Sequence, residues 1–200
     1  MGEGLRERQR TERQDLIVET AEVLLAESGY QGWTLADLAD RAGISRRALY
    51  HHFPSKEAIA AETLARNLRA QTGELVQLAA DAIPGNRLRA AVGWFLERRS
   101  SPGAGTVRML KAEPGLQAAA RAFPVYQQAR QGFQAALARL VGQAQDAREI
   151  TTVWGAEDLA ALLVELLRGV DVEAWTPTHP EAAREVTELL FAGLGTGDGR

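Results

Sequence analysis

Cysteine is absent from the 200 residues, so disulfide bonds and thiolate chemistry are excluded, and a reducing compartment is compatible with the chain. No apolar run approaches the roughly 20 residues that a helix needs to span a bilayer. The first 15 residues are highly charged and lack the apolar stretch of a signal peptide. These absences predict a cytoplasmic protein.

Sequence signatures of catalysis are also missing. There is no glycine-rich phosphate loop, no G-x-S-x-G, no H-E-x-x-H and no cysteine pair. The histidines are His51, His52 and His179. Adjacent residues on a helix point about 100° apart, so His51 and His52 are badly placed to share a metal ion. The sequence therefore predicts no enzyme, no cofactor and no metal site.

Net charge gives little indication of a partner. The formal net charge is −3, and residues 1–57 hold eight Lys/Arg against ten Asp/Glu. A domain that binds nucleic acid is usually basic overall. Any such function must therefore rest on the local arrangement of charge.

The most informative stretch is 34–56, which predicts two short helices, a tight turn between them and the start of a third helix. Thr34 is a good N-cap, and Asp37 three residues on can complete a capping box. Gly43 ends the first helix, because glycine adopts the left-handed conformation common at helix termini. Ser45 can cap the second helix.

The second short helix has two different sides and is stopped by Pro54. Its inward residues are Ala48, Leu49 and Phe53, whereas its outward residues are Arg46, Arg47, Tyr50 and His51. This pattern indicates a helix-turn-helix, in which the second helix lies in the major groove of DNA.

Local charge supports that interpretation. The window 41–56 holds four basic residues, two histidines and no acidic residue. Arginine can donate two hydrogen bonds to guanine, while Lys56 and the Tyr50 hydroxyl suit phosphate oxygens. The alternative is that Arg46 and Arg47 form an ordinary solvated helix face. The turn, the caps and the acid-free window favour DNA.

The segment GYQGWTLADLADRAGISRRALYHHFPSKEAI resembles the DNA-binding domain of the TetR/AcrR family of bacterial transcriptional regulators. The run ALYHHFPSKEAI is a specific motif for that family. The resemblance covers about the first third of the chain. It implies an all-helical homodimer, usually a repressor, whose amino-terminal domain binds a palindromic operator and whose larger carboxy-terminal domain dimerises and binds an inducer.

The predicted DNA-contacting residues come from the motif and from this resemblance. They are Thr34, Ser45, Arg46, Arg47, Tyr50, His51 and Lys56. Two positions depart from the family pattern. Arg47 stands where glycine is frequent, so the base preference of relatives does not carry over. Trp33 stands where a smaller residue is usual, and we interpret it as a packing residue.

The amino terminus allows two interpretations. Residues 1–13 are polar and are expected to be mobile, with a helix from about Arg13 to Ser28 behind the helix-turn-helix. In one interpretation, arginines of this arm reach the DNA backbone or minor groove. In the other, acidic neighbours offset them in a frayed start. The arginines are Arg6, Arg8, Arg10 and Arg13, and the acidic neighbours are Glu3, Glu7 and Glu12.

The rest of the chain predicts further helices. Residues 58–80 form a connecting helix, 82–86 are a breaker, and 87–99 are helical. A short helix is expected at about 106–112, EPG at 113–115 breaks it, and a longer helix follows Pro124. Apolar stripes at 156–170 and 180–194 predict two final helices, which either pair with a second subunit or fill the monomer core. The resemblance favours the dimer.

Effector contacts are the least defined prediction. The candidate residues are Trp94, Met109, Leu110, Phe123, Tyr126, Trp154 and Leu162. Apolar side chains of this kind suit a ligand pocket and an ordinary core equally. No dense charged cluster indicates an ionic inducer, so a small, mostly hydrophobic molecule is expected.

The sequence as a whole predicts an all-α protein with two domains. Residues 1–57 form the arm and the helix-turn-helix domain, and residues 58–200 form the effector-binding and dimerisation domain. The predicted function is a ligand-responsive repressor that a small hydrophobic effector releases from a palindromic operator. The alternative is a helical small-molecule-binding protein without DNA recognition.

Overall fold

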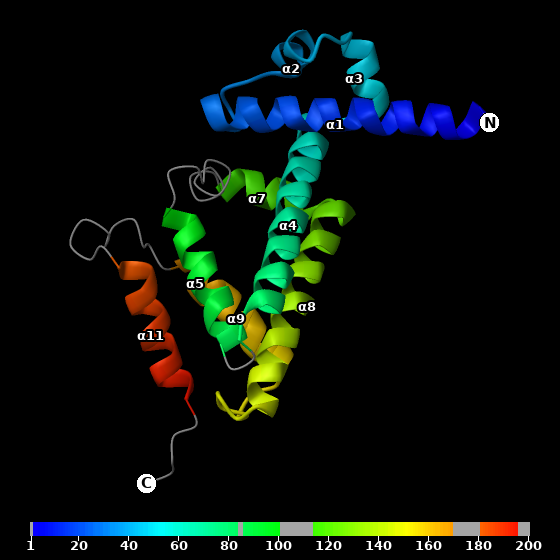
Figure 1. Cartoon of the computed structure of the whole chain (residues 1–200). Coiled ribbons are helices and arrows are strands. Elements are labelled where there is room, and N and C mark those ends of the chain that lie inside the picture. The colour runs from blue at the N-terminus through cyan, green and yellow to red at the C-terminus, as the bar shows by residue number, and fades with distance from the viewer. Residues whose placement is uncertain (1, 84–85, 101–113, 170–180, 196–200) are drawn as a thin grey trace. The chain divides into compact units, whose positions relative to one another are not determined.

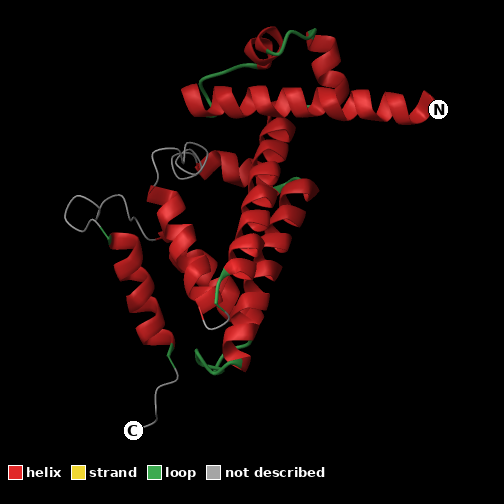
Figure 2. Ribbon diagram, viewed as in Figure 1, coloured by secondary structure: helices red, strands yellow, loops and turns green. Residues whose placement is uncertain are grey.

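The structure is a computed structural model that describes residues 2–83, 86–100, 114–169 and 181–195. Every regular element in these ranges is an α-helix, which confirms the all-α prediction (Figure 1, Figure 2). The chain forms two compact units. One comprises Met1–Leu68 with Gly105–Ala129, and the other comprises Arg69–Ala104 with Arg130–Arg200.

The first unit contains the predicted helix-turn-helix. It is built from α1 (Gly2–Ser28), α2 (Leu35–Arg41), α3 (Arg46–His52), the first half of α4 (Lys56–Asp81), α7 (Pro114–Arg121) and the start of α8 (Pro124–Asp146). Its core is continuous across these helices. Fully buried members from different helices include Ile17, Leu38, Leu49, Ile59 and Leu116.

Local signals set the short helices as the sequence predicts. Thr34 and Asp37 form the capping box of α2, and the Ser45 hydroxyl accepts a hydrogen bond from the Ala48 amide at 3.1 Å. Gly43 has a φ of +67°, in the left-handed region. The hydroxyl of Ser55 caps α4 by accepting from the Ala58 amide at 3.2 Å. At the start of each of these three helices, a nearby side chain thus accepts a hydrogen bond from a backbone amide that has no partner within the helix.

Two predictions about this unit are wrong. The arm is helical rather than mobile, because α1 begins at Gly2 and not near Arg13. Leu, Arg, Glu and Gln dominate these residues, and all of them are good helix formers, so polarity alone was a poor guide to order. The second error is α7, which opens at Pro114 where the sequence predicted only a break. Proline is well suited to the first position of a helix.

The second unit contains the rest of α4 and α8 with α5 (Arg87–Ser100), α9 (Ala156–Gly169) and α11 (Ala182–Leu194). The predicted boundaries of α5 and α9 agree with the structure to within one residue. Arg89 of α5 pairs with Glu188 of α11 at 2.7 Å and lies over the Phe191 ring at 4.4 Å. None of the helices in the described residues is long and apolar enough to cross a membrane.

Two glycines with open space around the missing Cβ allow a test of this backbone analysis. Gly43→Ala should lower the free energy of unfolding by about 1–2 kcal/mol, because alanine is strained at its positive φ. Gly73→Ala, inside α4, should raise it by about 0.5–1 kcal/mol through better helix propensity. Denaturant unfolding measures both. Gly43→Asn is the control and should lose less than Gly43→Ala, and shifts of the same sign in the two alanine variants would contradict the assignment.

Candidate nucleic-acid interface and effector cavity

The helix α3 has one buried side and one open side. Leu49 is fully buried and Phe53, its C-cap, is 7% exposed. The residues predicted to face solvent are all exposed, and they are Arg46, Arg47, Tyr50 and His51. Tyr50 keeps 54% of its surface open, which is unusual for a large aromatic residue. The outer side of α3 therefore offers two guanidinium groups, a phenol and an imidazole without acidic neighbours on the same helix.

The turn before α3 fixes the angle at which this side is presented. The Gly43 amide donates to the carbonyl of Asp40 at 3.2 Å, and the Ile44 amide donates to the carbonyl of Ala39 at 3.0 Å. Ile44 is partly buried against the core. The left-handed residue, the paired amides and the apolar plug leave α2 and α3 little freedom to rotate against each other.

At the start of α2, Thr34 and Asp37 bind each other closely. The Asp37 Oδ2 accepts from the Thr34 amide and from the Thr34 hydroxyl, each at 2.7 Å, while the hydroxyl accepts from the Asp37 amide at 3.2 Å. The hydrogen bond from the Thr34 hydroxyl, followed by that from its amide, lowers the pKa of Asp37. Thr34 is exposed. The phosphate contact predicted for Thr34 would thus come from a residue whose side chain already caps α2.

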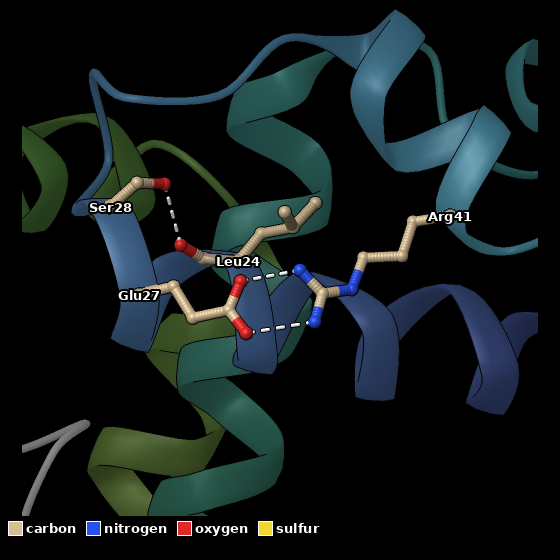
Figure 3. Close-up of polar contacts among 4 residues, drawn as sticks. All are labelled: Leu24, Glu27, Ser28 and Arg41. Atoms are coloured by element: carbon tan, nitrogen blue, oxygen red, sulfur yellow. Dashed lines mark hydrogen bonds and ion pairs between the residues drawn. The ribbon is translucent and has the colours of Figure 1, made fainter.

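An ion pair joins the end of α2 to α1. Both terminal nitrogens of Arg41 donate hydrogen bonds to the carboxylate of Glu27, and the distance from Nη2 to Oε1 is 2.8 Å (Figure 3). The same close-up shows the Ser28 hydroxyl donating to the carbonyl of Leu24 at 2.9 Å. The hydrogen bond from Arg41 lowers the pKa of Glu27. Both side chains are exposed, so the pair aligns α2 on α1 more than it adds stability.

Lys56 occupies a position that the sequence did not predict. Its Nζ donates to the carbonyl of Trp33 at 2.5 Å and lies 4.3 Å from the centre of the Trp33 ring and 4.7 Å from that of Tyr30. Trp33 is 2% exposed, which agrees with the packing role predicted for it. Two aromatic faces and a carbonyl of the same unit therefore hold this ammonium group in place. The predicted contact of Lys56 with phosphate stays a prediction that this geometry does not favour.

A second bond ties the same loop to α4. The Tyr30 hydroxyl donates to Glu57 Oε1 at 3.3 Å. Hydrogen bonds from the backbone amide of Glu57 and then from the Ser55 hydroxyl lower the pKa of that carboxyl, with the Tyr30 bond contributing less. Tyr30, Trp33, Lys56 and Glu57 together are called the Lys56 clasp below. The clasp holds the loop that enters α2 against the first turn of α4.

His52 is the last residue of α3 and is partly buried. Its Nδ1 is buried and has no hydrogen-bond partner within the described residues. Burial lowers the pKa of this imidazole, and the charges of His51, Arg10 and Arg13 lower it further. The last two come from α1, so the first half of α1 lies close to the end of α3. Among the described residues, no group of three or more His, Asp or Glu could hold a metal ion.

Those residues predicted to bind an effector that the structure describes do not gather in one place. Met109 and Leu110 lie outside the described residues. Tyr126 is 6% exposed in the core of the first unit, and Phe123 packs against that core. Trp154 and Leu162 are surface residues, 50% and 44% exposed, so a pocket role for them is not supported. Trp94 is partly buried beside Arg98, whose guanidinium lies 5.5 Å from its ring centre.

A small apolar cavity of about 10 Å³, no larger than one water molecule needs, nevertheless lies within the second unit. Its lining comes from α4, α5, α8 and α9 and consists of Leu75, Ala91, Val92, Phe95, Phe133, Leu137, Val164 and Leu167. No described member of the predicted effector set belongs to it. The sequence could not identify this lining because each helix contributes one to three residues from segments far apart in the chain. Phe95 and Phe133, with ring centres 6.2 Å apart, are its aromatic members.

The fold and the exposed side of α3 define an all-helical protein with a helix-turn-helix at its amino terminus. Residues 17–63 match the family model described as bacterial regulatory proteins, tetR family. This segment, which holds the helix-turn-helix, is thus similar to the DNA-binding domain of TetR-family transcriptional regulators.

The transcriptional repressor KstR2 of Mycolicibacterium smegmatis is 42% identical over 52 residues, which are 26% of this chain and 25% of that protein. The chain thus matches about a quarter of the length of this curated relative.

Solved structures extend the likeness of fold to nearly the whole chain. A TetR-family regulator from Pectobacterium atrosepticum superposes with a TM-score of 0.72 at 20% identity, covering 94% of this chain and 97% of that one. The regulator FadR from Bacillus subtilis in complex with stearoyl-CoA gives a TM-score of 0.67 at 14% identity, covering 92% and 98%. At such identities the likeness concerns the fold alone.

The Lys56 clasp predicts that Lys56→Met affects stability more than DNA binding. Removal of the ammonium group should lower the free energy of unfolding by about 1–2 kcal/mol. The dependence of random-duplex affinity on salt should not change, whereas removal of a phosphate-binding charge would reduce the slope of log K against log salt by about 0.9. Arg46→Met is the matched control on the open side of α3. A smaller slope in Lys56→Met with unchanged stability would instead support the phosphate contact.

Proposed function

We propose that this protein is a ligand-responsive, DNA-binding transcriptional regulator, acting as a cytoplasmic repressor. The observation that carries the proposal is the open side of α3, where Arg46, Arg47 and Tyr50 are exposed while Leu49 anchors the opposite side in the core. A helix of this size and charge fits the major groove, where arginine is the commonest reader of guanine. KstR2, the curated relative that is 42% identical over 52 residues, is a repressor.

A homodimer follows from the same proposal, because helix-turn-helix proteins usually read two half-sites related by symmetry. The stripe on α9 is wider than one monomer core uses. Leu159, Leu163 and Leu167 are buried, but Leu162 and Leu166 stay 44% and 46% exposed. Leu189 of α11 is 67% exposed as well. We assign these leucines to a subunit interface through α9 and α11, and sedimentation of the intact protein as a monomer at micromolar concentration would argue against it.

The apolar cavity of the second unit is the proposed effector site. Its described lining carries no charged or hydrogen-bonding side chain, so its chemistry suits a hydrocarbon group and disfavours an ionic one. At about 10 Å³ the cavity must widen before it admits such a group, and the effector is proposed to bind the widened state. FadR, which shares the fold, was solved with stearoyl-CoA. The proposed effector is therefore a small apolar molecule or the hydrocarbon part of a larger one.

Regulation requires that the effector bind two states of the protein with different affinity. The helix α4 takes part in both functions, since Lys56 belongs to the clasp beside the helix-turn-helix and Leu75 lines the cavity. A ligand that shifts α4 would therefore act on the clasp without any contact to α3. A protein of the rival class, a helical binding protein without DNA recognition, would keep the cavity but would not bind duplex DNA.

DNA recognition is tested with a mobility-shift assay on the duplex upstream of the protein's own gene. Arg47→Ala should weaken specific binding by about 1–3 kcal/mol if Arg47 reads a guanine. Arg139→Ala, an exposed arginine on α8, is the control and should bind as the parent does. Equal losses on specific and random duplex would mean that Arg47 touches only phosphate. No binding to any duplex by the parent would favour the rival class.

The effector site is tested by filling it. Ala91 lines the cavity and is 2% exposed, so Ala91→Leu should overfill it and keep a hydrocarbon group out, while lowering the free energy of unfolding by about 1–3 kcal/mol. We expect the parent to release duplex in the presence of saturated fatty acids or their acyl-CoA esters, and Ala91→Leu to bind duplex equally well but respond at least tenfold less. Ala80→Leu, exposed on α4, is the control. An undiminished response in Ala91→Leu would place the effector elsewhere.

A further inference from the structure

The helix α1 is longer than the core of its unit requires. Its first fully buried residue is Ile17, and the side chains of residues 4–13 are all exposed. About three turns of helix therefore precede the part that packs, at 3.6 residues per turn. Such a stretch contributes little to burial, so its surface chemistry indicates what it does.

Helical geometry gathers three of the four arginines on one side of this extension. At about 100° per residue, Arg6, Arg10 and Arg13 fall within a sector of about 60°. Arg8 points about 140–160° away from all three. Its Nε donates to the carbonyl of Gly4 at 3.2 Å, so it folds back on its own helix.

The sector occupied by the three arginines is the side on which α3 lies. Ile17 falls in the same sector by helical spacing and is fully buried in the core that α3 joins. The charges of Arg10 and Arg13 act on His52 of α3, which places them beside the end of that helix. Figure 1 shows α1 continuing past α3 towards the amino terminus. The cationic side of the extension is thus no longer covered by α3.

The acidic residues of the extension whose side chains the structure describes lie outside the arginine sector, and Glu3 is not among the described side chains. Glu12 and Asp15 point at least about 100° from the middle of the arginine sector, and Glu7 points about 90° from it. Asp15 also pairs with Arg66 of α4 at 3.6 Å, on the far side of α1. Among the side chains that the structure describes, Arg6, Arg10 and Arg13 have no carboxylate partner.

We propose that Arg6, Arg10 and Arg13 form a second DNA-binding face, which contacts backbone phosphates flanking the half-site read by α3. The inference rests on the proposed function. A recognition helix sunk in a major groove about 8.5 Å deep has a phosphate backbone on each side. A helix that lies behind it and extends past its end meets those phosphates rather than bases. Arginine binds phosphate with paired hydrogen bonds, and such contacts position the protein without reading sequence.

The test compares a triple variant with a single one. Arg6→Gln, Arg10→Gln and Arg13→Gln are combined, because glutamine keeps helix propensity while removing charge. Affinity for a random-sequence duplex is measured over a range of salt. Every arginine that binds a phosphate adds about 0.9 to the slope of log K against log salt, so the triple variant should have a slope smaller by up to about 2.7. Arg8→Gln is the matched control and should keep the parental slope.

Two further measurements make the outcome decisive. Circular dichroism of both variants checks that α1 stays helical, and Arg46→Gln reports on the open side of α3 in the same assay. A triple variant with the parental slope, alongside a reduced slope in Arg46→Gln, would overturn the inference and leave the proposed function standing. Equal reductions in the triple variant and in Arg8→Gln would also overturn it, because general charge loss would then explain both. Failure of the parent to bind any duplex would overturn the inference and the proposed function together.

Discussion

Presentation of the DNA-reading residues depends on the burial of the opposite side of α3. That helix has only seven residues, and isolated helices of this length are not stable in water. Leu49 and Phe53 hold it in the core of the first unit, with exposed fractions of 0% and 7%. Burying side chains of this size contributes about 1.5–3 kcal/mol each. The arginines outside can therefore be placed by apolar contacts and do not have to stabilise the helix themselves.

The Lys56 clasp restrains a different movement, that of the loop before α2. Apolar contacts keep α2 and α3 on the core but do not prevent the loop before α2 from sliding over it. The ammonium group of Lys56 fixes that loop at the Trp33 carbonyl, and Glu57 fixes it at the Tyr30 hydroxyl. Directional bonds of this kind define position as well as adding stability. They also make the first turn of α4 the part of the fold through which a movement of α4 would reach α2.

Much of the helix-turn-helix could be predicted because its signals are local. The cap at Thr34, the positive φ at Gly43 and the stop at Pro54 each depend on a few neighbouring residues. Prediction failed where the outcome depended on partners far away in the chain. The role of Lys56 required knowing that Trp33 lies beside it, and the cavity required four helices at once. Leu162 shows the same limit. The apolar stripe on α9 predicted that one side of the helix is buried, but it did not show which leucines are buried within the monomer.

Net charge was uninformative for a related reason. The first 57 residues carry two more acidic than basic residues, yet charges of opposite sign occupy different sides of the same helices. Glu19 and Asp15 face Arg66 on α4, whereas Arg10 and Arg13 face the end of α3. Because the Debye length is about 8 Å at physiological salt, a phosphate beside α3 senses the nearer arginines and little of the acidic side. An acidic domain can in this way present a cationic surface, so the distribution of charge over helix sides predicts binding where the total does not.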